Sequence, residues 1–303
     1  MDRRLWDELY RLIIMLGKAH DRARLQYSNA CIALVYLWSC VHDRPRCWAS
    51  DPENWNGHCP WAHLPSPSRL SRRLKTIGVL DLIRCGEAWL RDQFSDHALK
   101  VIDAKPLPVG GASKDRDARC GRCVRGQARG YKIHVIIDKS GSLDSWRLTA
   151  MSANEKPVAQ TLFDAGLRPG AMYVAADNEY DGNETFDSAA GAGTQLVVSP
   201  RRKKPAGLGH RRQSPNRLRS LAMTSNPLAA TGQTSSFGQD LLHERGAIER
   251  FFAHVGNFGG GLAPLPNWVR RPRRVALWVA GKFMIYLARL LTQKGAKKLD
   301  LQR

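Results

Sequence analysis

Two aspartates, Asp103 and Asp177, each end a short run of apolar residues that is predicted to form a β-strand. In an α/β sheet, sites form in the crevice beyond the carboxyl ends of the strands. If the two strands are neighbours, their carboxylates converge, and two such charges are tolerated only with a cation between them. Oxygen ligands in a small, partly hydrated site select Mg²⁺ or Mn²⁺. The pair therefore predicts a divalent metal site.

A third acidic residue, Glu249, lies in the segment HERGAIERFFAHVGNF, which is predicted to be helical. Arg245 and Glu249 are four residues apart and share one face of that helix, whereas Ile248 and Phe251 would face a core. By itself, such a pair is best interpreted as an exposed ion pair worth roughly a few tenths of a kcal/mol. The local pattern alone does not make Glu249 a metal ligand.

The elements that must position these residues begin near residue 99. The hydrophobic pattern predicts three strands, then a helix, a strand, a helix, a strand and a closing helix. The predicted strands cover 99–103, 131–138, 145–150, 171–177 and 194–199, and the helices cover 156–165, 184–190 and about 240–255. This order is the one expected of an α/β, RNase H-like domain, which is a mixed sheet with helices on both faces.

The residues before this domain predict a smaller, all-helical region. An apolar face with helical spacing runs through 3–16, and 29–41 is apolar enough to be a buried helix. After a Trp- and Pro-rich loop, Ser66 is a candidate N-cap, Pro67 suits the first helical position and Gly78 is a candidate stop.

The helix expected after Ser66 carries basic side chains on one side and apolar side chains on the other. A basic helix behind another helix fits a helix-turn-helix over about 52–78, whose second helix would enter the major groove of DNA. The alternative is an ordinary helix with a solvated basic face. The DNA-binding candidates here are Arg69, Arg72 and Arg73.

The charge of the whole chain also favours a nucleic acid partner. Its 303 residues carry 47 Lys and Arg against 27 Asp and Glu, a formal net charge of +20 that a DNA backbone would neutralise. A polar connector, 201–240, is basic and has enough Gly and Pro to disfavour a regular helix, and a second cluster, WVRRPRR, precedes the last helix. Their phosphate-binding candidates are Arg201, Arg202, Lys203, Lys204, Arg211, Arg212, Arg270 and Arg271.

Features of membrane and secreted proteins are weak. The apolar stretch 275–291 is interrupted by Lys282 and Arg289, which favours a buried helix over a membrane span. The seven scattered cysteines are typical of reduced thiols, and Cys120 and Cys123 have no second CxxC nearby to complete a zinc site. We expect a cytoplasmic, nucleoid-associated protein without a membrane or a small-molecule substrate.

Four segments resemble the DDE transposases of bacterial insertion sequences, in the broad IS4/IS5 group. VIDAKPLPV resembles the strand of the first Asp, and GRCVRGQARGYKIHVIIDKSG is similar to the segment that follows it. YVAADNEYDGNETFD resembles the second-Asp motif, with Tyr180 three residues after Asp177, and RGAIERFFAHV resembles the third motif. The resemblance covers roughly residues 99–291, with the motifs in the family's order.

This resemblance implies that Asp103, Asp177 and Glu249 hold two divalent ions, Mg²⁺ or Mn²⁺. One ion would activate water or a DNA 3′-hydroxyl, and the other would stabilise the leaving oxygen. The same site would nick the ends of the element and then join them to target DNA. Arg245 would clamp a phosphate or carboxylate, because guanidinium is planar and bidentate.

Two positions depart from the family pattern. Leu242 stands where the family often has Tyr, and Gly256 stands where it often has a Lys or Arg that contacts the transposon end. Arg250 or the 201–219 cluster could replace that contact in a variant subfamily, and a decayed copy is the other interpretation.

The sequence therefore predicts a helical DNA-binding region over 1–97 and a catalytic domain over 98–303. Because transposition needs two DNA ends held together, we expect a homodimer on double-stranded DNA. Two alternatives are a catalytically silent, repressor-like or decayed derivative that only binds DNA, and an RNase H-like nuclease that cuts without joining.

Overall fold

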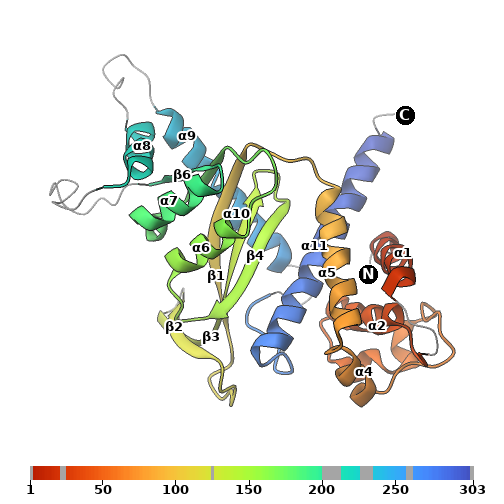
Figure 1. Cartoon of the computed structure of the whole chain (residues 1–303). Coiled ribbons are helices and arrows are strands. Elements are labelled where there is room, and N and C mark those ends of the chain that lie inside the picture. The colour runs from red at the N-terminus through yellow and green to blue at the C-terminus, as the bar shows by residue number, and fades with distance from the viewer. Residues whose placement is uncertain are drawn as a thin grey trace. The chain divides into compact units, whose positions relative to one another are not determined.

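The computed structural model describes residues 3–20, 25–123, 126–199, 213–225, 235–256 and 262–300 (Figure 1). The chain divides into two compact units. We call Met1–Phe94 with His254–Arg303 the helical unit, and Ser95–Ala253 the sheet unit. The expected catalytic domain over 98–303 has other bounds than the sheet unit, because the helix over 272–300 contacts the N-terminal helices.

The sheet unit is built on one mixed sheet, in the order β2-β3-β1-β5-β6, with β4 also paired to β3. β3 is antiparallel to β1, β2 and β4, whereas β5 is parallel to both β1 and β6. The strands are β1 (Leu99–Pro108), β2 (Arg119–Cys123), β3 (Gly126–Asp138), β4 (Leu143–Ala150), β5 (Tyr173–Ala176) and β6 (Gln195–Val198). This is the RNase H-like α/β fold that the strand and helix order predicted, with the short strand β2 added.

The first strand is longer than expected. β1 does not end at Asp103 but continues to Pro108, because it pairs with β3 along its whole second half. Asp103 lies opposite Val135 in that ladder, so it is a mid-strand residue. Only the parallel pairing with β5 stops near Asp103, so β1 and β5 part at this point.

Helices α6 (Glu155–Asp164) and α7 (Asn183–Gly191) cover one face of the sheet. Ile102 of β1 and Ile136 of β3 pack there in a buried cluster with Phe163 of α6. Since side chains alternate along a strand, Asp103 and Lys105 project from the opposite face. Lys105 Nζ lies 5.1 Å from the ring centre of Phe252, which places α10 (Gly246–Gly256) on that opposite face.

Two predictions about the later helices are wrong. The connector contains the helix α8 (Pro215–Thr224), because Ser214 caps it and Pro215 occupies its first turn. The single helix expected over about 240–255 is two, α9 (Phe237–His243) and α10. The chain turns at 244–245, immediately before Gly246, a residue that disfavours a helix interior.

The helical unit packs α1 (Arg3–His20), α2 (Asn29–Val41), α5 (Ile77–Asp92) and α11 (Pro272–Asp300) around one core. The Trp- and Pro-rich loop supplies α3 (Arg46–Ala49) and the short η1 (Pro52–Trp55). The ring of Trp55 stacks on that of Trp38 at 4.6 Å, and Trp6 meets Trp38 edge-on at 4.7 Å. The loop thus belongs to the core.

By length and composition, residues 272–293 of α11 could cross a membrane, but 67% of this apolar window is buried inside the unit. Lys282, one of the charges that interrupt it, is buried, pairs with Asp43 and lies 4.9 Å from the ring centre of Trp278. These contacts are those of a core helix.

The helix-turn-helix expected over about 52–78 does not form in this described stretch. The basic helix α4 (Pro67–Arg73) has Ser66 as its N-cap, as predicted, but it ends at Arg73, and a long loop separates it from η1. Gly78 does not stop a helix but lies in the first turn of α5. A Cβ added at Gly78 would lie 2.8 Å from the side-chain nitrogen of Asn29, so this glycine makes room for the start of α2.

Candidate active site

Asp103 and Asp177 lie side by side at the point where the parallel strands part. Leu99 pairs with Tyr173 and Val101 with Ala175, so the same register brings Asp103 opposite Asp177. Asp177 follows directly after β5 and caps the short helix η2 (Asn178–Tyr180), where its Oδ1 accepts a 2.9 Å hydrogen bond from the backbone N–H of Glu179. The expected convergence of the two aspartates is therefore present.

The surroundings of Asp103 change its pKa. Burial raises the pKa of Asp103 to about 6, and the carboxylate of Asp177 adds to this effect. The backbone N–H of Ala104, which donates to Asp103 Oδ1 at 2.7 Å, and the guanidinium of Arg245 act in the opposite direction. Asp103 is thus a carboxylate whose charged form needs a positive neighbour.

A further acid, Glu155, belongs to this neighbourhood and was missed in the sequence. It is the first residue of α6 and accepts a 3.1 Å hydrogen bond from Lys132 of β3. Burial raises the pKa of Glu155, Lys132 lowers it, and the charges of Asp177 and Glu179 raise it further. An acid in the first turn of a helix is commonplace, so nothing in the local pattern distinguished Glu155.

Tyr180, the aromatic three residues after Asp177, is fully buried beneath these acids. Its hydroxyl has no hydrogen-bond partner among the described residues. Burial raises its pKa well above the usual value, and the charges of Glu155, Asp103 and Asp177 raise it further. The phenol therefore stays neutral and keeps a proton to donate next to the acids.

Arg245 acts on the charge of Asp103, whereas no such effect is seen for Glu249. Arg245 immediately precedes α10 and is close enough to lower the pKa of Asp103. Glu249 lies in the first turn of α10, on the Asp103 side of the sheet, and is exposed to solvent. Within the described ranges, no group of three His, Cys, Asp or Glu side chains is gathered for a metal ion.

The donor set fits a hard divalent cation. Asp103 and Asp177 offer carboxylate oxygens where β1 and β5 part, and a cation would offset both the burial and the charge of Asp177 that raise the pKa of Asp103. Cys120 and Cys123 form no such pair, because residues three apart in strand β2 point to opposite faces.

The basic residues predicted to bind DNA fall into three groups. Arg69, Arg72 and Arg73 together line one hollow of the helical unit. Arg250 is exposed on α10, whereas Arg270 donates to carbonyl oxygens of its own loop, including that of Pro266 at 2.6 Å, and Arg271 follows it. The candidates Arg201, Arg202, Lys203, Lys204, Arg211 and Arg212 lie outside the described residues.

Comparison with known proteins shows similarity to a family and to solved structures. The family described as "Transposase DDE domain" matches residues 95–288. A cryo-EM structure of the piggyBac transposase synaptic complex with hairpin DNA is similar in fold, with a TM-score of 0.50 at 10% sequence identity. The similarity covers 97% of this chain and 74% of that one. No curated protein matches the chain in sequence.

Proposed function

The chain belongs to the family of transposases with a DDE domain, and on that premise we propose that it nicks the ends of a DNA element and joins them to target DNA. We place it in the IS4/IS5 group, whose motifs its sequence resembles. The observation that carries the proposal is the pair Asp103 and Asp177, in register at the parting of β1 and β5. This pair lies inside the segment that the family matches.

In this proposal, Asp103, Asp177 and Glu249 hold two Mg²⁺ or Mn²⁺ ions. Divalent ions bound there would supply positive charge for the attacking and the leaving oxygen of an in-line displacement at phosphorus. The position of Glu249 at the start of α10, on the face from which Asp103 projects, supports its place in this set.

Other side chains bind and orient the DNA strand. Arg245 carries a positive charge toward Asp103, and its partly buried guanidinium suits a bidentate hold on the phosphate beside the ions. Tyr180 keeps its proton and supplies a buried hydrogen-bond donor next to the acids. Arg250, exposed one residue after Glu249, is suited to the neighbouring phosphate.

DNA binding is assigned to the N-terminal helical region, 1–97, and to the basic clusters of 201–212 and 268–274. Their many positive charges give affinity for the backbone of double-stranded DNA. Two ends must be held together for transposition, and we therefore propose a homodimer on DNA.

The test is strand cleavage and strand joining by Asp103→Asn, with Glu184→Gln as the control. Glu184 is an exposed acid in the first turn of α7 and is not among the charges that shift the pKa of Asp103, so its change removes one negative charge without acting on that carboxylate. Asp103→Asn should lower divalent-dependent cleavage by about 10³-fold or more, and the control should keep it.

Three outcomes decide between the functions. Cleavage and joining that both depend on Asp103 support the transposase. Cleavage without joining identifies a nuclease, and DNA binding without cleavage in the unchanged protein identifies a silent derivative.

A further inference from the structure

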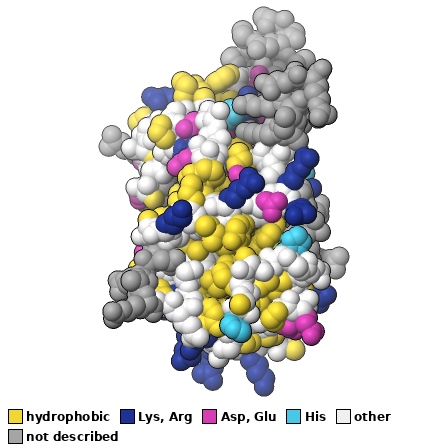
Figure 2. Space-filling model, turned by 90° about the vertical axis from the view of Figure 1, so that its right-hand side faces the viewer, with side chains coloured by type: hydrophobic (Ala, Val, Ile, Leu, Met, Phe, Trp, Pro, Cys, Tyr) yellow, Lys and Arg dark blue, Asp and Glu magenta, His cyan; other side chains and the backbone are white. Residues whose placement is uncertain are grey.

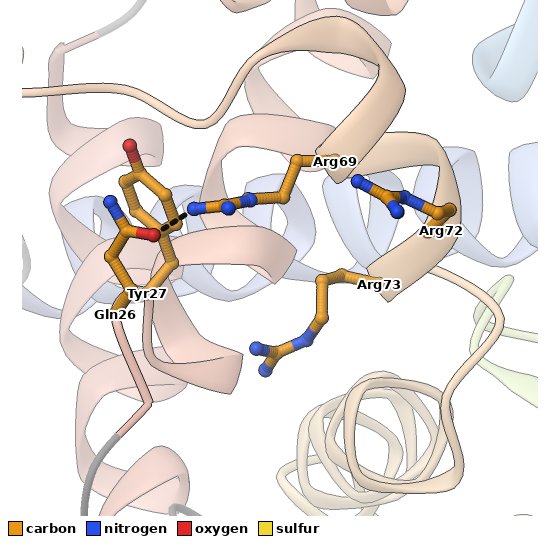
Figure 3. A pocket seen from close by; sticks show the side chains of 5 residues that line it. All are labelled: Gln26, Tyr27, Arg69, Arg72 and Arg73. Atoms are coloured by element: carbon orange, nitrogen blue, oxygen red, sulfur yellow. Dashed lines mark hydrogen bonds between the residues drawn. The ribbon is translucent and has the colours of Figure 1, made fainter.

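The basic hollow of the helical unit is built from two segments far apart in the sequence. Gln26 and Tyr27 come from the chain just before α2, and Arg69, Arg72 and Arg73 come from α4. Figure 3 shows the guanidinium of Arg69 directed at Gln26 and Tyr27, with Arg72 and Arg73 on the same helix. The hollow is open to solvent and has a volume of about 400 Å³. Lys and Arg side chains also gather at the lower end of the face in Figure 2.

Neutral groups hold two of these guanidiniums in place. Arg69 donates to the side-chain oxygen of Gln26 and lies 5.6 Å from the ring centre of Tyr27. The hydroxyl of Tyr27 is itself fixed, because it donates to the carbonyl oxygen of Leu64 at 3.1 Å. Arg73 donates to Oδ1 of the buried Asn29 at 2.7 Å.

These partners orient the charges without neutralising them. In the described part of the chain, none of Arg69, Arg72 and Arg73 forms a salt bridge, and no carboxylate lines the hollow. Three like charges on one short helix repel each other, and a bound anion relieves that repulsion. Planar guanidinium groups match the oxygens of a phosphate in particular.

Base recognition fits this hollow poorly. Arg69 already covers the face of the Tyr27 ring, which leaves that face unavailable for stacking a base. Arg73 is drawn back toward the start of α2, so it does not project from α4 as a side chain must to reach base edges in a groove. A backbone phosphate, by contrast, needs only to enter the open hollow.

We infer that Arg69, Arg72 and Arg73 form a clamp for a phosphodiester of the DNA backbone, which binds without reading sequence. This inference rests on the proposed function, since it takes DNA as the substrate. Gln26 is exposed and neutral, and a phosphate oxygen replaces its side-chain oxygen on Arg69. Asn29 and Gly78 set the position of Arg73, because the side chain of Asn29 occupies the space that a Cβ at residue 78 would fill.

The test is the affinity for labelled duplexes of several sequences, measured by fluorescence anisotropy between about 50 and 200 mM salt. The double variant Arg69→Ala/Arg73→Ala should bind all sequences more weakly and lower the slope of log affinity against log salt by roughly 2. Arg11→Ala is the matched control, because Arg11 is an exposed arginine of α1 that does not line the hollow.

Two further variants separate the clamp from bulk charge. Gly78→Ala removes no charge, yet it should weaken binding by displacing Asn29 and Arg73. Gln26→Ala should leave the affinity equal or higher, since it frees Arg69. Thermal melts of each variant test whether the protein is folded. If the double variant does not fold, Arg73→Lys replaces it in the measurement of duplex affinity.

Several results would overturn the inference. A double variant equal to Arg11→Ala shows that the hollow does not contact DNA, and a loss confined to one sequence shows base reading. If inorganic phosphate stabilises the unchanged protein but not the double variant, while their DNA affinities are equal, the hollow is a site for free phosphate. A failure of the unchanged protein to bind any DNA counts against the proposed function instead.

Discussion

The sheet unit and the helical unit each bring like charges together, but by different means. Asp103 and Asp177 are distant in sequence and meet because β1 and β5 pair in parallel. Arg69, Arg72 and Arg73 are close neighbours on one short helix, and contacts with Gln26 and Asn29 direct two of them. The acids are partly buried, and burial and the charge of Asp177 raise the pKa of Asp103, whereas the arginines line a hollow that is open to solvent. One place is suited to a cation and the other to phosphate.

The largest expected effect separates these two places. Asp177→Asn should lower cleavage by about 10³-fold or more while changing duplex affinity less than about twofold. Arg69→Ala/Arg73→Ala should mainly lower duplex affinity, and its cleavage should recover at saturating DNA. Cleavage rates at several DNA concentrations measure both effects. If both variants lose cleavage at saturating DNA, or both lose duplex affinity, the assignment of cleavage to the acids and of DNA binding to the arginines is wrong.

The second prediction concerns the scaffold under the acids. Lys100, which precedes Asp103 on β1, is buried and pairs with the buried Asp144 at 3.1 Å. Lys100→Met removes the buried cation 3.1 Å from that carboxylate and should cost about 3–5 kcal/mol of unfolding free energy, measured in urea. Arg73→Ala, at the surface of the helical unit, should cost no more than about 1.5 kcal/mol. If the two variants lost equal free energy of unfolding, Arg73 would contribute as much to the stability of the helical unit as Lys100 does to that of the sheet unit.

The sequence predicted those parts of the acidic site and of the arginine hollow that depend on local patterns, and it missed those that depend on contacts between distant residues. The alternation of apolar residues located the strands, and the positions of Asp103 and Asp177 at their apparent ends were enough to predict that the two carboxylates meet. Glu155 escaped because only the packing of α6 on the sheet brings it close. Gly78 was misread as a stop because its role is to accommodate Asn29, a contact across many residues. Arg69 and Arg73 were identified by charge, but their neutral partners could not be.

The third prediction is a pH dependence of metal binding. A bound divalent ion needs an ionised Asp103, and its pKa of about 6 lies above the usual value. Between its ordinary pKa and about 6, the folded state holds more protons than the unfolded state, so the metal-free protein loses stability as pH rises. Affinity for Mn²⁺ should therefore fall about tenfold from about pH 7 to pH 5. Calorimetric titration measures it, and a constant affinity over this range would contradict the assignment. Duplex affinity of the arginine hollow should not follow this curve.

The smallest expected effect decides whether Glu155 or Glu249 is the third metal ligand beside Asp103 and Asp177. Glu155→Gln keeps the shape of the side chain and removes one of the charges that raise the pKa of Asp103. If Glu155 acts only through its charge, the titration of Asp103 moves to lower pH and Mn²⁺ affinity at neutral pH changes less than about threefold.

Glu249→Gln, the paired variant, should lower Mn²⁺ affinity by about tenfold or more, because it removes a proposed ligand. The structure makes this contrast informative, since the charge of Glu155 already raises the pKa of Asp103 whereas Glu249 is exposed on α10. A large loss in Glu155→Gln with none in Glu249→Gln would transfer the third ligand from α10 to α6. Equal losses would mean that carboxylates from both helices bind the ions, one from each face of the sheet.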